Sequence, residues 1–556
     1  MHDDLSRAEP GNQARYAWLP TCSEAQAPPP MTRSTPAAIV RKISRLRSGQ
    51  HPRMMDLFSG CGGLTLGFQT AGFRLVASVE IDRWAADSHG INFALNSPNK
   101  EAHHKARNIV KEEPGDIFQE LGISGHVDDQ IDVMVGGPPC QAFARVGRAR
   151  LRDAARQRKD ADADFAHISD SRVNLYQRYL HYVEQTKPVA LLMENVPDIL
   201  NHAGRNVAEI VAENLTAMGY VCRYTLLNAS SYGVPQTRER MFLIAIHEAL
   251  GVEPEFPKPT HWCEIPPGYE STRSSARKLV GSRNGQQLLV FSHHRWIDEP
   301  HADSGLLPAT TAKEALADLP SIDARDLLRR KAISFGRKDP AEPVGYTKSV
   351  PSTPWSKLMR EWPQFSTKES TTGHVIRYLP RDYKIFHVME EGWEYPRVWQ
   401  WVEEKRTRML DNRWMRGETI DGRNAEVKEL VKSWTLPYNP ATFSNRWWKL
   451  YADKPVRTLM AHLGKDSYSH IHFDSEQART ISVREAARLQ SFPDGFRLSG
   501  SLNPAFKQIG NAVPPLMAYA LAVAMRSTMG LQTLKDIRID TLGLDRSMIG
   551  TTPGRE

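Results

Sequence analysis

From residue 54 the chain alternates short apolar runs with longer amphipathic stretches. The apolar runs have the length of β-strands and lie at residues 54–58, 75–81, 131–135, 190–193, 221–227 and 241–246. Strands that alternate with helices predict a doubly wound α/β domain, in which a mostly parallel sheet is covered on both faces. The last two runs leave no room for a crossover helix, so we expect them to pair as an antiparallel hairpin at the end of the sheet.

The alternation stops near residue 256 and partly returns after residue 474. The intervening segment is irregular, rich in Pro, Arg and Lys, and holds 11 of the 13 Trp residues, most of which we expect in a core. Residues 482–490 and 515–525 are typical of helices, and the second is apolar enough to be buried. The predicted units are a mobile basic and Pro-rich extension at 1–52, the first part of the α/β domain at 53–255, an irregular second domain at 256–474, a return to the first domain at 475–530, and a tail at 531–556.

Composition narrows the class of protein. The 556 residues carry a formal net charge of +8, which suits a polyanionic partner. The longest apolar run, 516–525, is well short of the ~18 residues of a membrane span, and no signal segment opens the chain, so we expect an intracellular protein with no membrane contact. A start at Met31 is as compatible with the extension as one at Met1.

The cysteines and histidines argue against a metal site. No two of the five cysteines have the short spacing of a zinc or iron–sulfur site, and the adjacent histidine pairs lack further ligands. The sequence therefore predicts no metal. What remains is a set of inert buried thiols, or one thiol that acts as a nucleophile in a reducing compartment.

The first motif with chemical meaning is DLFSGCGG at 56–63, which ends a predicted strand and opens a helix. Glu80-Ile81-Asp82 ends the next strand. Glycines let backbone N–H groups approach a ligand, and a carboxylate in that place can bind ribose hydroxyls. Thr65 stands where a dinucleotide fingerprint has its third glycine, which disfavours a pyrophosphate. The segment predicts a nucleoside cofactor, or a turn that serves only packing.

Three further motifs follow predicted strands. Residues 136–143 (GGPPCQAF) present Cys140 on a rigid Pro-Pro turn at the edge where open α/β sheets bind ligands. Residues 194–197 read ENVP, and residues 236–240 read QTRER. In an extended segment alternate residues point to one side, which puts Arg238 beside Arg240.

These motifs continue in order with REAARLQSFP at 484–493 and QIGNAVPP at 508–515. Taken together, the six motifs resemble those of the DNA (cytosine-5) methyltransferase family. The resemblance implies a Rossmann-like, S-adenosylmethionine-dependent methyltransferase domain, with residues 256–474 as the target-recognition domain. The implied activity is methyl transfer to C5 of a flipped-out cytosine in double-stranded DNA.

The resemblance also implies a role for each motif residue. Cys140 attacks C6 of the base, Glu194 hydrogen-bonds its exocyclic amine and N3, and Arg240 with Arg238 holds O2 and nearby phosphates. Asp116 has the plainer alternative of capping a helix. The implied S-adenosylmethionine-binding residues are Phe58, Gly60, Gly62, Glu80, Ile81, Asp116, Ile117, Pro138, Asn511 and Val513.

The basic stretch after Cys140 corresponds to a loop that closes over DNA in this family, although charge runs are more often solvated helices. Its expected DNA contacts are Gln141, Arg145, Arg148 and Lys159. Ala144 stands where many family members have serine, and the loop before Asp170 is long, which leaves loop timing and the detail of flipping open.

The size of the recognition segment favours DNA over the transfer RNA that a related branch methylates. A catalytically inactive, DNA-binding regulator is expected to have lost Cys140 or Glu194, and both are present. We expect a monomer on DNA in a bacterial cytoplasm, associated with the nucleoid. We expect a role in restriction–modification or another phage defence, with an endonuclease or a defence complex as functional partner. The alternative is a role as an orphan regulator.

Overall fold

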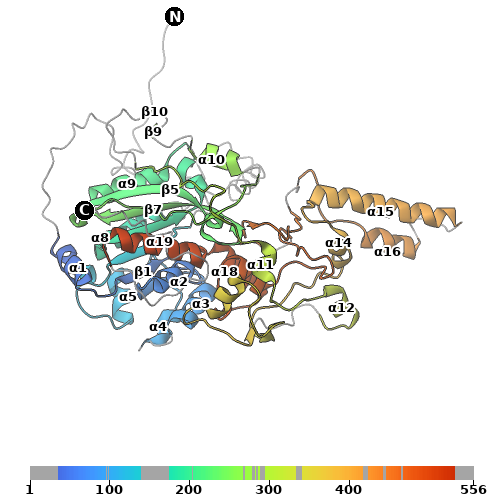
Figure 1. Cartoon of the computed structure of the whole chain (residues 1–556), viewed down its shortest axis with the longest axis horizontal. Coiled ribbons are helices and arrows are strands. Elements are labelled where there is room, and N and C mark those ends of the chain that lie inside the picture. Colours follow the sequence, from blue (N-terminus) through green and yellow to red (C-terminus); the bar gives the residue numbers. More distant parts are fainter. Residues whose placement is uncertain are drawn as a thin grey trace, which may run out of the picture.

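The protein is built around one twisted α/β sheet (Figure 1). The computed structural model describes residues 36–94, 97, 99–139, 175–202, 204–266, 269–277, 282–283, 286–287, 295–333, 341–416, 424–442, 446–464 and 468–531. Within these residues the central sheet has six strands in the order β2-β1-β3-β4-β7-β5. No helix in the same residues is long and apolar enough to cross a membrane.

The strand pattern predicted from the sequence is confirmed. The six strands are β1 (Arg53–Leu57), β2 (Arg74–Val79), β3 (Val133–Gly136), β4 (Ala190–Asn195), β5 (Tyr220–Asn228) and β7 (Glu239–His247). The first four are parallel to one another, whereas β7 runs antiparallel to both β4 and β5. The expected hairpin at the end of the sheet is therefore present. Its connection contains β6 (Gln236–Thr237), which pairs with β14 (Val456–Arg457) from far along the chain.

Two hydrophobic clusters cover the two faces of the sheet. Successive strand residues alternate between them: Leu192 belongs to one cluster, and Leu191 and Met193 belong to the other. The first cluster contains α1 (Ala37–Arg47), α2 (Gly63–Thr70), α17 (Val483–Leu489), α18 (Leu502–Asn511) and α19 (Pro515–Thr528), and the second contains α5 (Pro114–Glu120), α8 (Leu175–Thr186) and α9 (Val207–Ala217). The predicted helices at 482–490 and 515–525 are thus confirmed as α17 and α19.

The strand order changes direction between β1 and β3. Strand β2 lies on one side of β1. Strand β3 lies on the other side of β1, and β4 follows β3 in the same direction. At such a switch point the loops that leave the carboxyl ends of the two strands diverge and leave a crevice where ligands bind. The loops that leave β1 and β3 carry the glycine motif and the Pro-Pro turn, so the fold brings these two motifs to one place.

The prediction of a mobile extension over 1–52 is wrong for its last part. Residues 37–47 form α1, and Ile39, Ile43 and Leu46 pack into the first cluster. Lys42 is fully buried, and its Nζ donates to the backbone oxygens of Thr186 and Lys187 at 2.7 and 2.8 Å. Lys42 is therefore used inside the fold, whereas Arg41 and Arg47 are exposed. Residues 1–35 lie outside the described part of the chain.

The predicted second domain at 256–474 divides into two parts. Helices α11 (Ala312–Leu316) and α13 (Pro354–Glu361) pack into the first cluster of the central domain. Trp362, directly after α13, is fully buried, and its Nε1 donates to Thr70 Oγ1 at 3.0 Å. The expected boundary is therefore wrong, because residues 312–319 and 355–365 complete the core of the α/β domain.

The remainder forms a separate projecting lobe, which we define as residues 376–447 together with α12 (Ala324–Arg329). It has its own hydrophobic cluster, which contains the fully buried Trp447. Its helices are α14 (Tyr383–Val388), α15 (Tyr395–Met415) and α16 (Ala425–Ser433), and Figure 1 shows α15 and α16 extending away from the sheet. Nine of the eleven Trp residues in the segment belong to a hydrophobic cluster or pack against one; Trp262 and Trp414 do not.

Candidate active site

The turn after β1 is shaped by residues with positive φ. Phe58 has φ 57°, Gly60 has φ 55° and Gly62 has φ 104°. A Cβ on Gly62 would lie 2.2 Å from Cε2 of Phe93, and a Cβ on Gly63 would lie 2.1 Å from the carbonyl oxygen of Val513. Only glycine fits either position. The structure therefore brings Val513, from the far end of the chain, against the glycine turn.

Glu80 follows β2 and fixes this turn. Its carboxylate accepts hydrogen bonds from the backbone N–H of Gly60 at 2.8 Å and of Asp82 at 2.7 Å. Burial raises the pKa of Glu80, and these two backbone hydrogen bonds oppose that rise. The neighbouring Ile81 is 66% exposed, which is unusual for a branched apolar side chain. The hydrogen-bonded carboxylate of Glu80 thus lies next to the exposed apolar side chain of Ile81.

Two further predicted cofactor residues, Asp116 and Ile117, differ in their exposure. Asp116 is exposed on α5, and its Oδ2 accepts from the backbone N–H of Glu113 at 3.4 Å in a capping box. Ile117 is fully buried in the second cluster. The side chain of Asp116 is therefore available at the surface. Ile117, which was expected to bind S-adenosylmethionine, is a core residue.

The C-terminal motifs reach the site through two buried glutamines. Gln236 Nε2 donates to Gln490 Oε1 at 2.5 Å, and Gln490 Nε2 donates to the carbonyl oxygen of Ala512 at the same distance. Asn511 and Val513 flank that carbonyl, the first exposed and the second buried. One hydrogen-bonded path therefore joins three of the sequence motifs.

The Pro-Pro turn after β3 lies against the end of β4. Pro138 is buried, and its carbonyl oxygen accepts from Asn195 Nδ2 at 3.1 Å. A Cβ on Gly137 would lie only 2.7 Å from Glu194 Oε2, so a larger residue there would displace the carboxylate. Cys140 and the expected DNA contacts Gln141, Arg145, Arg148 and Lys159 lie outside the described residues, and their roles stay predictions.

Glu194 and Arg240 form an ion pair at this edge of the sheet. Arg240 Nε lies 3.1 Å from Glu194 Oε1, and each side chain is 13% exposed. Glu194 pairs in register with Phe242, two residues from Arg240 on β7, which puts both side chains on one face. Burial raises the pKa of Glu194, and the charges of Arg240 and Arg238 oppose that rise. The carboxyl group of Glu194 therefore has a pKa above its ordinary value.

The expectation that Arg238 holds the base or a phosphate does not fit the structure. Its side chain is 1% exposed, and its two Nη atoms donate to the carbonyl oxygens of Leu459 at 2.9 Å and Gly510 at 3.0 Å. The planar fork of the guanidinium is thus used within the protein. Arg238 ties the start of β7 to the two C-terminal segments, and Arg240 alone of this pair lies beside Glu194.

Sequence reasoning missed a buried polar chain behind the glycine turn. Thr65 Oγ1 donates to Asp56 Oδ2 at 2.6 Å and lies 3.0 Å from His89 Nε2. All three residues are buried, and Asp56 Oδ1 has no hydrogen-bond partner among the described residues. The signal in the sequence was Asp56 itself, an acidic residue at the end of an otherwise apolar strand.

The buried Asp56 predicts a pH-dependent stability. Burial raises the pKa of Asp56 to about 7 from the ordinary 3.8. Between these two values the folded state holds a proton that the unfolded state releases, so the free energy of unfolding falls as pH rises from about 4 to 7. The Asp56→Asn variant has no proton to lose, so its free energy of unfolding should not fall in this way. Relative to the wild type, its free energy of unfolding should therefore rise by up to roughly 4 kcal/mol between about pH 4 and 7. Urea unfolding at pH 5, 6, 7 and 8 measures this difference, and parallel curves would contradict the prediction.

The residues present fit an adenosine-containing cofactor. Glu80 uses one lone pair of each oxygen on the backbone, and the remaining lone pairs can accept from a ribose diol. Ile81 offers an apolar surface for a ring, and the exposed Asp116 can accept from an exocyclic amine. Ser59 Oγ is buried beside the turn without a partner among the described residues. In those residues no group of three His, Cys, Asp or Glu side chains could hold a metal ion.

Comparisons with known proteins find one family model and several relatives. The model of the family described as C-5 cytosine-specific DNA methylase matches residues 52–326 and 328–527. M.OihORF3336P of Oceanobacillus iheyensis, named as a predicted type II methyltransferase, is 36% identical over 482 residues, which is 86% of this chain and 96% of that protein. Type II methyltransferase M.AgeI of Thalassovita gelatinovora is 30% identical over 495 residues, 85% of this chain and 99% of its own.

A solved structure supports the fold. It is that of a predicted DNA modification methyltransferase encoded within a prophage, from E. coli, and it matches with a TM-score of 0.51 at 20% identity over 86% of this chain and 99% of that one. At this identity the likeness concerns the fold alone.

Proposed function

Because the chain belongs to the C-5 cytosine-specific DNA methylase family, we propose that it methylates C5 of a cytosine flipped out of double-stranded DNA, through a covalent bond between Cys140 and C6. The observation that carries the proposal is the buried Glu194–Arg240 pair. It lies at the sheet edge where the Pro-Pro turn ends and presents a carboxyl group of raised pKa beside a guanidinium. That pair suits the N3 and O2 edge of a cytosine.

The first step is nucleophilic addition to the ring. C5 of cytosine is a poor nucleophile until another group adds at C6. The thiolate of Cys140 forms a bond to C6, and the electron pair of the C5–C6 bond moves onto the ring, toward C5 and N3. Glu194 hydrogen-bonds N3 and the exocyclic amine, and its proton neutralises the charge that develops there. Arg240 donates to O2 with a group that cannot lose its charge.

S-adenosylmethionine, when bound, supplies a methyl group on a positively charged sulfur. Within this chain Glu80 would hold the ribose, Ile81 the ring face and Asp116 the adenine amine, while Phe58, Gly60 and Gly62 would line the methionine part. Pro138, Asn511 and Val513 would close the pocket. The glycine turn makes this possible because it leaves backbone N–H groups without side chains over them.

The product forms when the bond to the protein breaks. C5, now nucleophilic, would take the methyl group, and the electron pair of the broken S–CH3 bond would stay on the cofactor's sulfur as a neutral thioether. A base then removes the C5 proton. The electron pair of that C–H bond restores the C5–C6 double bond, and Cys140 leaves as a thiolate. The thiol is therefore regenerated in each turnover, and no oxidant, reductant or metal enters the balance.

A base in a duplex cannot reach such a site, so the cytosine must leave the stack at a cost of a few kcal/mol. Gln141, Arg145, Arg148 and Lys159 follow the nucleophile and are proposed to hold the opened duplex. Because phosphate contacts release counterions, DNA binding should weaken steeply as salt rises.

The direct test is a methyl-transfer assay with purified protein. We expect labelled methyl groups to move from S-adenosylmethionine to C5 of cytosine in duplex DNA, and to do so equally well in the presence of a metal chelator. Transfer RNA under the same conditions is the comparison substrate. Equal or greater transfer to RNA would overturn the DNA assignment.

We propose a role in bacterial restriction–modification, in the cytoplasm, with an endonuclease as functional partner. The two relatives described above are named type II methyltransferases, which supports this role. Bisulfite sequencing of DNA from cells that express the protein would identify the methylated site. Methylation of a site that a neighbouring endonuclease cuts supports the role, whereas scattered methylation without a shared sequence opposes it.

We further propose that the projecting lobe chooses the target sequence. It has a core of its own and extends from the catalytic body, so it can change without disturbing the chemistry (Figure 1). A hybrid that takes residues 376–447 from a relative with a different known site should keep its activity and methylate the relative's site. Each good bidentate contact to a base edge discriminates by about 1 to 3 kcal/mol, so a few side chains suffice. An active hybrid that still methylates the original site would contradict this division.

A further inference from the structure

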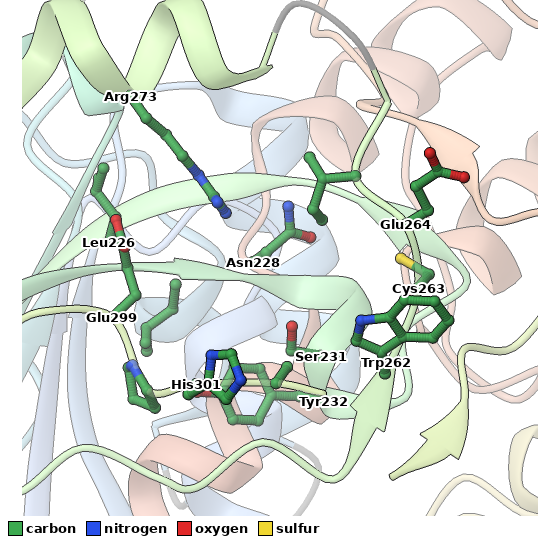
Figure 2. A pocket seen from close by; sticks show the side chains of 14 residues that line it. Leu226, Asn228, Ser231, Tyr232, Trp262, Cys263, Glu264, Arg273, Glu299 and His301 are labelled. Carbon is green, nitrogen blue, oxygen red and sulfur yellow. The ribbon is translucent and has the colours of Figure 1, made fainter. Parts of the chain in front are cut away.

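A cavity outside the predicted cofactor and cytosine sites opens beside the edge strand β5. Its volume is about 280 Å³, and it is lined by the end of β5, by β8 (His261–Trp262), by α10 (Tyr269–Arg277) and by residues 299–302. Figure 2 shows the amide of Asn228 near the middle of this space, with Arg273 above it, Ser231 below it and Trp262 at one side. This volume is slightly under the ~300 Å³ at which pockets for drug-sized ligands begin, so it suits one base or nucleoside.

Two lining residues carry polar atoms without partners. Asn228 is 5% exposed, and its Oδ1 accepts from the backbone N–H and the hydroxyl of Ser230, at 3.1 and 2.9 Å. Its Nδ2 has no partner among the described residues, and neither has Oε1 of Glu299. The other oxygen of Glu299 pairs with Arg277. Buried polar atoms of this kind are rare in native proteins and call for an occupant.

The polarity of these atoms defines the occupant. Asn228 can only donate from Nδ2, and Glu299 can only accept at Oε1. Arg273 also lines the cavity as a donor, with its Nε held by Glu239 Oε1 at 2.5 Å. Two donors and one acceptor match the edge of guanine, where O6 and N7 accept and N1–H donates. Trp262 is 38% exposed and supplies an aromatic face for stacking.

We propose that this cavity binds a guanine base. The carboxylates of Glu264 and Glu299 both line it, which disfavours a bare anion such as phosphate and favours a neutral ring with N–H groups. Adenine is the poorer match because its N6 and N1 reverse the donor and acceptor of guanine O6 and N1–H. The proposal does not depend on methyl transfer, since free guanosine can test it.

The position of the cavity indicates two sources for that guanine. In the sheet register Leu227 pairs with Arg240 and Asn228 with Glu239, so the cavity wall is the neighbouring strand of the proposed cytosine site. Successive strand residues alternate between faces, so Asn228 and Glu239 lie on the face opposite Leu227 and Arg240. The two sources to distinguish are therefore a guanine of bound DNA beyond the end of these strands and a free guanine nucleotide that enters as a regulator. Both sources share the same base edge.

The test is equilibrium binding of guanosine, with adenosine and cytidine for comparison. We expect guanosine to bind at least about tenfold more tightly than either, and Glu299→Gln to weaken it by about 10- to 100-fold, the usual effect of losing a hydrogen bond to a charged group. Asn228→Asp keeps the oxygen that caps the turn and replaces the donor, so it should cause a similar loss. Glu255→Gln, at an exposed position that does not line the cavity, is the matched control and should bind guanosine as the wild type does.

A competition experiment shows whether the guanine comes from bound DNA or from a free nucleotide. If the DNA supplies the guanine, saturating guanosine weakens binding of a labelled mixed-sequence duplex; if the occupant is a free nucleotide, guanosine binds equally to free and DNA-bound protein. Thermal unfolding of each variant shows whether it is folded. Guanosine binding no tighter than adenosine binding, or unchanged guanosine binding in a folded Glu299→Gln variant, would overturn the proposal, whatever the result of the methyl-transfer assay.

Discussion

Replacement of Cys140 by Ala is expected to abolish methyl transfer while binding of S-adenosylmethionine stays within a small factor of the wild type. The thiolate makes the covalent bond that activates C5, and no other group at the site can replace it. Loss of a nucleophile commonly costs on the order of 10⁴-fold or more in kcat. The residues that we propose for the cofactor lie on the turn after β1, just after β2, in the first turn of α5, on the Pro-Pro turn and at the end of α18, and this substitution leaves them unchanged.

The covalent step has its own readout. DNA with 5-fluorocytosine at the target should form a complex with wild-type protein that survives denaturation, because fluorine at C5 cannot leave as a proton does. Cys263→Ala is the matched control, since that thiol is partly exposed and lines the guanine cavity instead. It should trap DNA as the wild type does. A denaturation-resistant complex with Cys140→Ala would remove Cys140 from the mechanism.

The architecture was largely predictable because strands and buried helices leave periodic signals. All six strands of the sheet were expected within a few residues, and the apolar run that became α19 was expected to be buried. Helix α1 was not expected, because basic residues separate its three core positions. The burial of Lys42 depends on two backbone oxygens more than 140 residues away, which no local pattern encodes.

The site was predictable only where a motif carries its own chemistry. Glu194 and Arg240 were expected to act together, and the register of β4 and β7 brings them to 3.1 Å. Arg238 has the same residue type and nearly the same place in the motif, yet it lies inside the protein. The difference arises from Leu459 and Gly510, whose carbonyl oxygens arrive from distant segments. The division of residues 256–474 into two parts was also not predictable. The part that completes the core of the α/β domain has no strand–helix alternation that would mark it in the sequence.

Substitution of Glu194 by Gln should lower kcat by about 10²- to 10³-fold, the usual effect of losing one charge-stabilising contact in a transition state. Gln can hydrogen-bond N3 and the exocyclic amine, but it has no proton to give. The raised pKa of Glu194 means that the wild type keeps that proton to higher pH than an ordinary carboxyl group does. The wild-type rate should therefore fall on the alkaline side as Glu194 ionises, and the Gln variant should lack that fall.

Gly137→Ala tests the same carboxyl group without changing it. The new Cβ would lie 2.7 Å from Glu194 Oε2, so the carboxylate must move away from its place beside Arg240. We expect a reduced kcat with a nearly unchanged KM for DNA, because Gly137 itself touches no substrate. Gly345→Ala is the matched control, since a Cβ there would meet nothing closer than 3.8 Å.

A Glu194→Gln rate within about threefold of the wild type would show that N3 needs no proton from this residue. Full activity in Gly137→Ala would instead show that the exact place of the carboxylate does not matter.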